Sequence, residues 1–562
     1  MRRLNVNYRH ARRNRIYLVL LLFAGTFTSY AQSQWDSDGG VENVEVEIVK
    51  ERQIVLPAAN RNFEKVPPRP VEPIKPEITY SFKNLQFNAP DFTPIIRPLK
   101  LKQEAISKLY GNYVSVGFGN YNAPYIEGRF NSKRDKSKFY GLELYHQAYG
   151  TGPVDGRNSG SGNSKIRLFG KVYTKSVAAG AFLSHENIGT HFYGYTPGEI
   201  VVRDDIRQIY NITSLGVDVE NATSSDFNYN LKTGFSYLYD DYKAAESEVD
   251  LNFSSNYKIA EDQNIVLKAD YFLITRKDEL VDAKPRHLFK VAPAYTFSPI
   301  EKLLVTAGIN TAYENDLIGK NKPFHVYPNL RADYKLGTAV DAYAALTGDM
   351  DKVSLQTLAR ENLWVNSNIG VYHTNRSVEF LTGLKGKLGK RVGFGTGLSF
   401  ANLKDLYFYQ NSVADRSKFD VVYDDGNTQR TNLFAELNFN HAEKVSFLMR
   451  GDYFNYSTDN IVVAYHRPTY RLLVNSSFFI YSKLLFQPDL VVQGGMKTLD
   501  PEKNLVVDID PAVDLNLRMD YFLSPRASVF LKFNNILSNK YQVYLNYPVR
   551  GLQVSAGFSW SF

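Results

Sequence analysis

The chain ends in Gly551-Leu-Gln-Val-Ser-Ala-Gly-Phe-Ser-Trp-Ser-Phe562, and this stretch decides how the rest is interpreted. From Gln553 onward, apolar and small polar residues alternate strictly. Because successive side chains of a strand point to opposite faces, the alternation predicts a strand with one apolar and one polar face. A closed membrane barrel explains both this pattern and the aromatic last residue. In such a barrel the apolar face meets lipid, the polar face meets the lumen, and aromatic residues gather at the interfaces.

The composition of the 562-residue chain favours the same class of protein. Aromatic residues make up 14%, with 39 Tyr and 36 Phe, which suits strands and aromatic girdles. The chain has no Cys, which excludes disulfides, thiolate metal sites, a Cys nucleophile and a lipidated Cys. The nine His show no spacing typical of metal ligands.

Candidate catalytic and metal-binding residues are few. The acidic pairs Asp424-Asp425 and Asp240-Asp241 are the nearest approach to a cation site, but Asp-Gly after such a pair is also a common hairpin turn. Three histidines that could stand at strand ends, as a lipase in the membrane would need, are His146, His185 and His373. No nucleophile elbow or phosphate-binding loop accompanies them. We therefore predict no catalytic residue, no cofactor and no metal, and so no enzyme.

The segment 1–31 has the features of a secretory signal peptide. Six arginines precede the apolar run 16–24, and Ser29-Tyr30-Ala31 is a small-x-small cleavage site. Without those arginines the formal charge falls from +8 to +2, so nucleic-acid binding has no electrostatic support. The run 16–24 is too short to span a bilayer comfortably, and no other stretch approaches the length of a membrane helix. A mature protein in the membrane must then be a barrel.

Residues 32–108 differ from the rest of the chain. Prolines accumulate between 57 and 98, most densely in the segment 66–76, which favours an extended polyproline II conformation. We expect a periplasmic arm that is extended or disordered; it either holds a partner or serves as a leader before the barrel. Before the prolines lies a short alternating segment that could pair as an added strand with a partner, made of Val44, Glu45, Val46, Glu47, Ile48 and Val49.

Residues 109–562 read as a repeating series of strands. Alternation as clear as that of the last strand recurs at 265–273, 303–310, 392–400 and 513–521. We predict an all-β fold: one large transmembrane antiparallel barrel of about 22 strands, with a range of roughly 20 to 24, following the extended Pro-rich arm. The uncertain segments are 404–410 and 416–424, which form either two strands or a bent hairpin outside the membrane. The apolar faces must point to lipid, because side chains cannot fill so wide a lumen.

The connections between these strands also alternate. Short turns are expected near 174–176, 222–226, 298–300, 387–389, 441–443 and 524–525, and longer loops at 150–163, 188–205, 276–285, 348–375, 456–467, 494–507 and 538–550. Outer-membrane barrels have short periplasmic turns and long outer loops, so we expect both barrel ends in the periplasm of a Gram-negative bacterium. The loop containing 349–364 carries a helical pattern of apolar residues, for either a short surface helix or a segment folded over the mouth or into the lumen.

From about Arg391 onward the chain resembles the barrel of TonB-dependent receptors. The residues that carry the resemblance are Phe419–Asp425, Leu531-Lys-Phe-Asn-Asn-Ile-Leu-Ser-Asn-Lys-Tyr541, and Tyr547-Pro-Val-Arg-Gly551 before the terminal strand. That family carries a folded plug inside the barrel, whereas the segment from Gln32 to Lys108 is Pro-rich and lacks the plug's Gly-rich signatures. The resemblance implies that Val44–Val49 stands in for the box that contacts a TonB-like protein.

Two functions follow from these observations. One is solute transport across the outer membrane through a barrel whose lumen is closed by the arm, by inward loops or by a partner. The other is a non-transporting structural or assembly subunit of an outer-membrane complex. The expected partners are outer-membrane lipid, the barrel-assembly machinery and a TonB-like or other protein that binds residues 32–108. Phe558, Trp560 and Phe562 are the predicted signal for barrel insertion.

Overall fold

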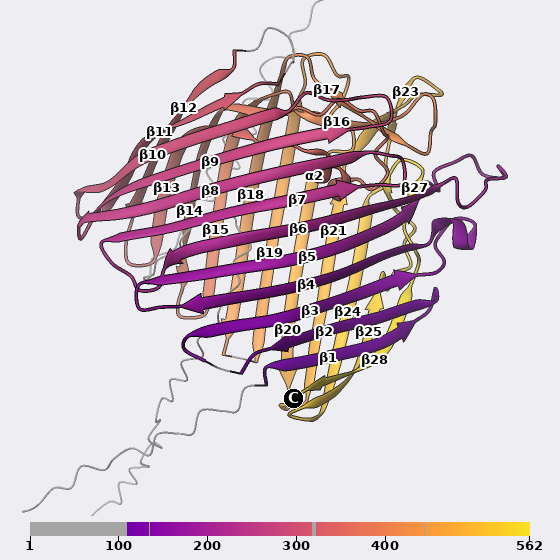
Figure 1. The fold of residues 1–562 in the computed structure, drawn as a ribbon, viewed down its shortest axis with the longest axis horizontal. Helices are drawn as coiled ribbons and strands as arrows, with labels where there is room; N and C mark the ends of the chain where they lie inside the picture. Colours follow the sequence, from indigo (N-terminus) through magenta and orange to yellow (C-terminus); the bar gives the residue numbers. More distant parts are fainter. Residues whose placement is uncertain (1–109, 134, 317–321, 443) are drawn as a thin grey trace, which may run out of the picture. The chain divides into compact units, whose positions relative to one another are not determined.

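The computed structural model describes residues 110–133, 135–316, 322–442 and 444–562. In them, 22 antiparallel strands form one closed sheet (Figure 1). The first eleven strands of the barrel are β1 Asn112–Gly119, β2 Ala123–Asn131, β3 Lys138–Tyr149, β4 Ser161–Tyr173, β5 Val177–His191, β6 Arg207–Asn221, β7 Phe227–Tyr239, β8 Ala245–Ala260, β9 Gln263–Lys277, β10 Arg286–Ile300 and β11 Leu303–Glu314. The other eleven are β12 Phe324–Lys335, β13 Val340–Asp351, β14 Thr374–Leu388, β15 Val392–Lys404, β18 Asn427–His441, β19 Val445–Ser457, β20 Tyr470–Ile480, β21 Leu484–Gly494, β24 Ala512–Ser524, β25 Ala527–Asn534 and β28 Gln553–Ser561.

The seam of the barrel lies between the first strand and the last. β1 pairs with β28 from Tyr113 opposite Ser561 to Gly119 opposite Ser555, so the barrel has no free edge. The strands on both sides of this seam, β1, β2, β25 and β28, have eight or nine residues and are the shortest in the wall. The prediction of a single all-β barrel of about 22 strands is confirmed.

The two ends of the barrel have different connections. At one end, the short-turn end, every connection has two to six residues. At the other, the long-loop end, most connections are longer, and the longest are 352–373 and 405–426. All of the expected short turns lie at the short-turn end, and all of the expected long loops lie at the long-loop end. The turn expected at 298–300 lies slightly further along the chain. Strand β10 continues through Pro299 to Ile300, where its pairing with β11 is irregular, and the turn comes at 301–302 instead of 298–300.

All smaller elements of the described residues belong to connections at the long-loop end. The segments left uncertain by the sequence form a separate hairpin, and not two barrel strands. These smaller elements are the 3-10 helix η1 Gly156–Ser159, the helix α2 Leu355–Glu361, and the paired strands β16 Tyr407–Asn411 with β17 Phe419–Tyr423, β22 Lys497–Asp500 with β23 Leu505–Asp508, and β26 Gln542–Tyr544 with β27 Tyr547–Pro548. Within the described residues, no helix is long and apolar enough to cross a bilayer.

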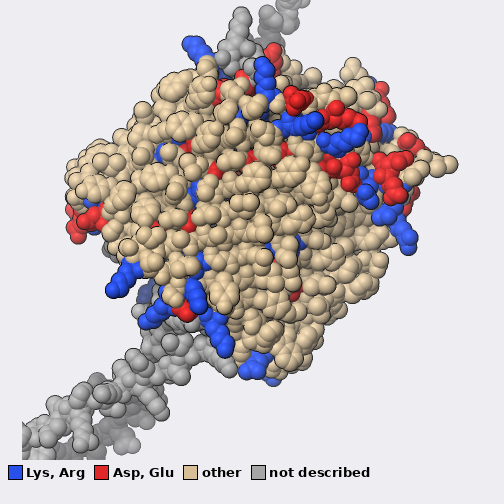
Figure 2. All heavy atoms as spheres, viewed as in Figure 1, with Lys and Arg blue, Asp and Glu red and all other residues tan. Residues whose placement is uncertain are grey.

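The outer face of the wall is apolar and nearly free of charge. Large apolar side chains stand exposed at alternate positions, for example Leu215 and Val217 on β6 or Leu433 and Leu437 on β18. Figure 2 shows this face as a broad uncharged band, with Lys, Arg, Asp and Glu gathered toward the two ends of the strands. A charge placed at the midplane of such a band costs about 2–4 kcal/mol, so the pattern is that of a lipid-facing surface.

The opposite face of the wall carries the same three-residue arrangement three times. It consists of an arginine, an aspartate two residues later on the same strand, and an aromatic ring on a neighbouring strand. In each case the aromatic residue is the register partner of the aspartate, and the guanidinium lies 4.7–5.3 Å from the ring centroid. The three instances are Arg331, Asp333 and Tyr343; Arg450, Asp452 and Phe434; and Arg518, Asp520 and Phe530. Each one combines an ion pair within a strand with a cation–π contact to the neighbouring strand.

The last of these groups reaches across the seam. The ring of Phe530 on β25 lies against two glycines, Gly557 on β28 and Gly117 on β1, which leave room for it because they carry no side chain. A Cβ at Gly557 would lie 2.2 Å from the Cζ atom of Phe530, and a Cβ at Gly117 would lie 2.8 Å from it. The ring of Phe530 therefore connects three consecutive strands, its own strand β25 and the strands β28 and β1, at the point where the barrel closes.

Candidate functional site: a loop cap at one end of the barrel

The connection between β13 and β14, residues 352–373, folds across the long-loop end and is called the α2 loop here. Its helix begins after Ser354, whose hydroxyl accepts a hydrogen bond from the backbone N–H of Thr357. Leu355, Leu358 and Ala359 form one face of the helix, and all three are almost completely buried. The opposite face, with Arg360 and Glu361, is exposed, but the helix is bound to wall residues of the barrel, which favours the alternative of a segment folded over the mouth.

The buried face of α2 is part of a large apolar cluster made by several loops and by the adjoining wall. We call this cluster the loop cap. Its members are Tyr193, Tyr195, Tyr210, Ile212, Leu238, Ala244, Val353, Leu355, Leu358, Ala359, Val365, Ile369, Val371, Tyr409, Phe419, Tyr544 and Tyr547. Tyr547 lies near its centre, with ring centroids 4.0 Å from Trp364 and 4.7 Å from Tyr193. The loops thus have a hydrophobic core of their own.

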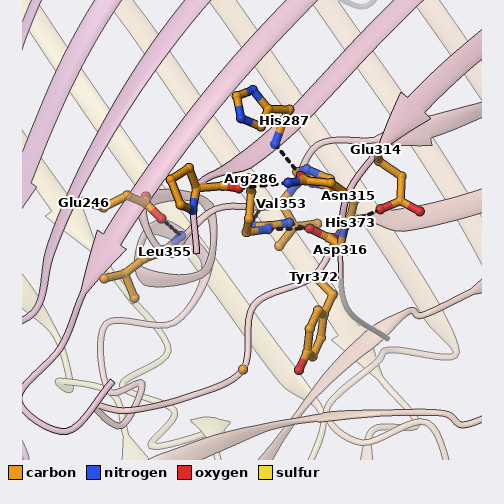
Figure 3. A network of polar contacts seen from close by, with 12 residues as sticks. Glu246, Arg286, His287, Glu314, Asn315, Asp316, Val353, Leu355, Tyr372 and His373 are labelled. Atoms are coloured by element: carbon orange, nitrogen blue, oxygen red, sulfur yellow. Dashed lines mark hydrogen bonds and ion pairs between the residues drawn. The ribbon is translucent and has the colours of Figure 1, made fainter. Parts of the chain in front are cut away.

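The wall anchors the start of α2 through a buried carboxylate. Glu246 on β8 accepts hydrogen bonds from the backbone N–H groups of Leu355 at 2.8 Å and Gln356 at 2.9 Å (Figure 3). The first N–H groups of a helix have no partner within the helix, and a negative charge there is favourable. Glu246 is 2% exposed, so this contact holds the helix directly against the wall.

The two basic side chains of the α2 loop that face the wall are paired with wall carboxylates. Lys352 forms an ion pair with Glu248 on β8. Arg360 forms one with Glu186 on β5, at 2.6 Å. Between these pairs, the hydroxyl of Ser236 on β7 donates to Gln356 at 3.1 Å. Polar contacts therefore attach the loop to three strands of the wall.

A second group of polar contacts holds both ends of the α2 loop (Figure 3). Arg286 binds the carboxylate of Asp316 at 2.6 and 2.9 Å, and donates to the carbonyl oxygen of Val353 at 2.9 Å. The backbone N–H of His373 donates to Asp316 at 2.7 Å, and Nδ1 of His373 accepts the N–H of Val353 at 3.1 Å. This ring must therefore be neutral, with its proton on Nε2. Burial, together with the nearby Arg286, lowers the pKa of His373 to about 3.

A second buried histidine joins three other loops. His466 donates from Nδ1 to the carbonyl oxygen of Tyr409 at 2.8 Å and accepts the backbone N–H of Leu545 at Nε2, at 3.2 Å. Since a carbonyl can only accept and an N–H can only donate, the ring is held as one neutral tautomer. Burial lowers its pKa to about 4. Both histidines stabilise the loop cap only in their uncharged form.

The acidic pairs considered for a cation bind backbone N–H groups, Asp424 those of a neighbouring loop and Asp240 those of its own turn. Asp424 is 1% exposed and accepts the backbone N–H groups of Asp459 and Asn460 at 2.9 and 2.8 Å, together with the hydroxyl of Thr428. Asp240 accepts the N–H groups of the turn that follows it. In the described part of the chain, no group of three or more possible ligands could hold a metal ion.

The residues predicted as sites lie elsewhere. Phe558, Trp560 and Phe562 are 36–50% exposed at the end of the terminal strand, and their role in insertion stays a prediction. The segment Val44–Val49 lies outside the described residues. Among the histidines, the rings of His146 and His185 are hydrogen bonded to a Ser and a Thr hydroxyl of neighbouring strands, and His373 belongs to the polar contacts that hold the α2 loop.

Sequence analysis missed the wall residues that hold the α2 loop. Glu186, Glu246, Glu248 and Arg286 show no motif, because their partners come from a loop far along the chain. One signal was present: Glu246, Glu248 and Asp250 alternate on β8, so three carboxylates share one face of a single strand.

The fold is that of solved outer-membrane receptors. The FrpB iron transporter from Neisseria meningitidis aligns with a TM-score of 0.62 at 9% identity, covering 81% of this chain and 82% of that one. The ferric-catecholate import receptor Fiu from E. coli K12, in its closed form, gives 0.61 and 9%, covering 81% and 82%. The siderophore receptor PirA from Acinetobacter baumannii gives 0.61 and 10%, covering 80% of each chain.

No family model and no curated protein matches the sequence. At such low sequence identity the likeness to the solved structures is one of fold, and it covers the barrel region. The chain has the 22-stranded barrel fold of TonB-dependent receptors. The solved proteins that share this fold are named as an iron transporter, an import receptor and a siderophore receptor.

Proposed function

We propose that this protein transports a solute across the outer membrane and that the α2 loop is its gate. The observation that carries the proposal is the position of residues 352–373, which fold across the mouth and attach to the wall through ion pairs and hydrogen bonds in addition to the apolar contacts of the loop cap. Polar contacts between a loop and a wall can be exchanged for contacts with water or solute when the loop moves. The strand pairing of the wall does not depend on these contacts, so the gate can open while the barrel stays closed as a ring.

In this proposal the long-loop end faces the outside and the short-turn end faces the periplasm. Both described ends of the barrel lie at the short-turn end, which suits a chain that enters the barrel from a periplasmic arm. We further propose that residues 32–108 contact a TonB-like protein through Val44–Val49, which would supply the energy for opening.

A reducible cross-link between the gate and the wall tests the proposal, because the chain has no cysteine of its own. The variant Ser236→Cys/Gln356→Cys places thiols at two side chains that are hydrogen bonded at 3.1 Å. Because Cys is shorter than Gln, a short bis-methanethiosulfonate is used to link the two thiols through a pair of reducible disulfides. The matched control, Ser214→Cys/Ser236→Cys, places thiols at register partners on β6 and β7 and leaves the α2 loop free. In planar bilayers we expect this reagent to abolish openings of the first variant and a thiol reductant to restore them, with no such change in the control.

A deletion gives the complementary result. Replacing residues 353–372 with a short Gly-Ser linker should produce a large, steady conductance. Silence of a folded variant that lacks both this loop and residues 32–108 would contradict transport through the lumen.

That outcome would favour the second function, a structural or assembly subunit. The specific observation on its side is the size of the loop cap, whose aromatic core is as tightly buried as that of a folded domain. Mild solubilisation of the outer membrane distinguishes the two functions. A subunit should co-purify with a defined partner, whereas a transporter should migrate as a barrel alone.

A further inference from the structure

The wall behind the α2 loop carries a concentration of negative charge. Glu246, Glu248 and Asp250 share one face of β8, and Glu186 on β5 completes the group, which we call the acidic strip. Three of the four carboxylates contact the α2 loop directly. The fourth, Asp250, is hydrogen bonded to Asn252 at 2.8 Å.

The charged groups that the loop presents to this strip are all positive. Lys352 forms an ion pair with Glu248, and Arg360 forms one with Glu186. The N-terminal end of α2, which is the positive end of the helix dipole, donates hydrogen bonds to Glu246. The acidic residue of the helix, Glu361, points elsewhere: its carboxylate accepts from Arg467 at 2.9 Å and from the hydroxyl of Tyr407. The loop therefore offsets the charge of three of the four carboxylates in the closed state.

A cavity of about 290 Å³ lies between the strip and the loop. The wall lines it with Glu248 and Asp250, and the loop lines it with Lys352, Gln356, Thr357 and Arg360. A small solute in this cavity can contact both partners of the Lys352–Glu248 ion pair. The side chain of Arg360 is 42% exposed, so its ion pair is accessible from the same space.

We propose that the acidic strip selects cationic solutes, and that Lys352 and Arg360 are tethered cations which an incoming cationic solute displaces. This inference rests on the proposed function of the α2 loop as a gate. Removing one partner of a buried ion pair leaves a costly unpaired charge, whereas exchanging one cation for another keeps every carboxylate paired. A cationic solute can therefore release the loop without leaving the strip bare, and an anion meets repulsion from the same carboxylates. Opening also leaves the lumen wall with exposed negative charge, which favours the passage of cations.

Reversal potentials in a potassium chloride gradient measure this selectivity. The variant to use is the full chain with residues 352–372 replaced by a Gly-Ser linker, because this removes both Lys352 and Arg360 and uncovers the strip. At about 0.1 M salt, where the Debye length is about 10 Å, we expect potassium to permeate better than chloride. At about 1 M salt the length falls to about 3 Å and the preference should largely vanish.

Two substitutions in that background test whether the strip is responsible. Glu248→Gln/Asp250→Asn should reduce the permeability ratio of potassium to chloride toward one. The matched control, Glu143→Gln/Asp489→Asn, removes two carboxylates on other strands, β3 and β21, and should leave most of the preference intact. Equal effects of the two pairs, or an initial preference for chloride, would overturn the proposal.

A polyamine tests displacement in the intact protein. Spermidine should raise the frequency of openings, citrate should not, and Glu186→Gln/Glu248→Gln should abolish the response to spermidine. If spermidine has no effect on a protein that does open, the proposed displacement of Lys352 and Arg360 by cationic solutes is wrong, whereas the proposal that the α2 loop is a gate is not contradicted. If no variant conducts at all, the proposed function itself fails.

Discussion

The wall of the barrel and the loop cap are built from contacts of different range. In the wall, each strand pairs with its neighbour in sequence, and β1 with β28 is the one exception among the 22 strands of the closed sheet. In the loop cap, Glu246 contacts a residue 109 positions away, and Tyr193 contacts Pro548, 355 positions away. A wall made of local pairs can stand without the cap, but the cap has no support without the wall.

The seam is the place where the wall should be easiest to break. Gly557→Leu would place a side chain on the ring of Phe530 and on the carbonyl oxygen of Val116, both 2.2 Å from the new Cβ. We expect the barrel not to close, seen as loss of the compact, heat-modifiable band in a detergent gel. Gly451→Leu on β19, where nothing lies within 4 Å, is the control and should fold. A folded Gly557→Leu barrel would show that the ring of Phe530 can move aside.

Acid should open the cap and leave the wall intact. The pKa values of His373 and His466 are about 3 and about 4 when buried, against about 6.5 when a released ring is solvated. The open state therefore binds more protons than the closed state as the pH falls below 6.5. By pH 5 the stability of the closed state relative to the open state has fallen by about 2 kcal/mol for each histidine.

The fluorescence of Trp364, which packs on Tyr547, reports this opening if Trp35 and Trp560 are replaced by Phe. His373→Gln/His466→Gln carries no titrating ring at these positions, so the change between pH 7 and pH 5 should largely disappear. An unchanged pH response in that variant would assign the effect to other groups.

A smaller loss is expected from the anchor of α2. Glu246→Gln removes the charge and leaves one backbone N–H of the helix without an acceptor, at a cost of about 2 kcal/mol. Trypsin should then cut after Arg360 faster than in the original protein. Glu220→Gln makes the same substitution on β6, at the short-turn end, and should leave the rate unchanged. Equal rates in all three proteins would mean that the anchor is redundant.

The smallest effect should come from an ion pair at the rim. Lys243 and Glu279 are 2.6 Å apart, but their side chains are 72% and 51% exposed. Glu279→Gln should change the tryptic rate by the equivalent of less than about 0.5 kcal/mol, because water screens the pair. A larger change would mean that the rim takes part in holding the cap.

The sequence predicts the wall well because each of its strands shows a period of two in its own residues. The terminal strand, the strand count and the separation of short turns from long loops all follow from such local patterns. Leu355 and Leu358 likewise show that a helix forms with one apolar face. The positions of Leu355 and Leu358 do not show which surface of the protein packs against this apolar face of the helix.

That surface is assembled from Tyr409, Phe419, Tyr544 and Tyr547, which belong to two other loops. The same limit hides the acidic strip. Its alternating carboxylates are visible in the sequence, but Lys352 and Arg360 are ordinary surface charges until the fold places them on the wall.

The anchoring of α2 by Glu246 also sets an order of assembly. The backbone N–H groups of Leu355 and Gln356 find their acceptor only when β8 already stands in the wall, so the helix cannot settle before the barrel has formed. A newly inserted barrel therefore passes through a stage in which its mouth is unsealed.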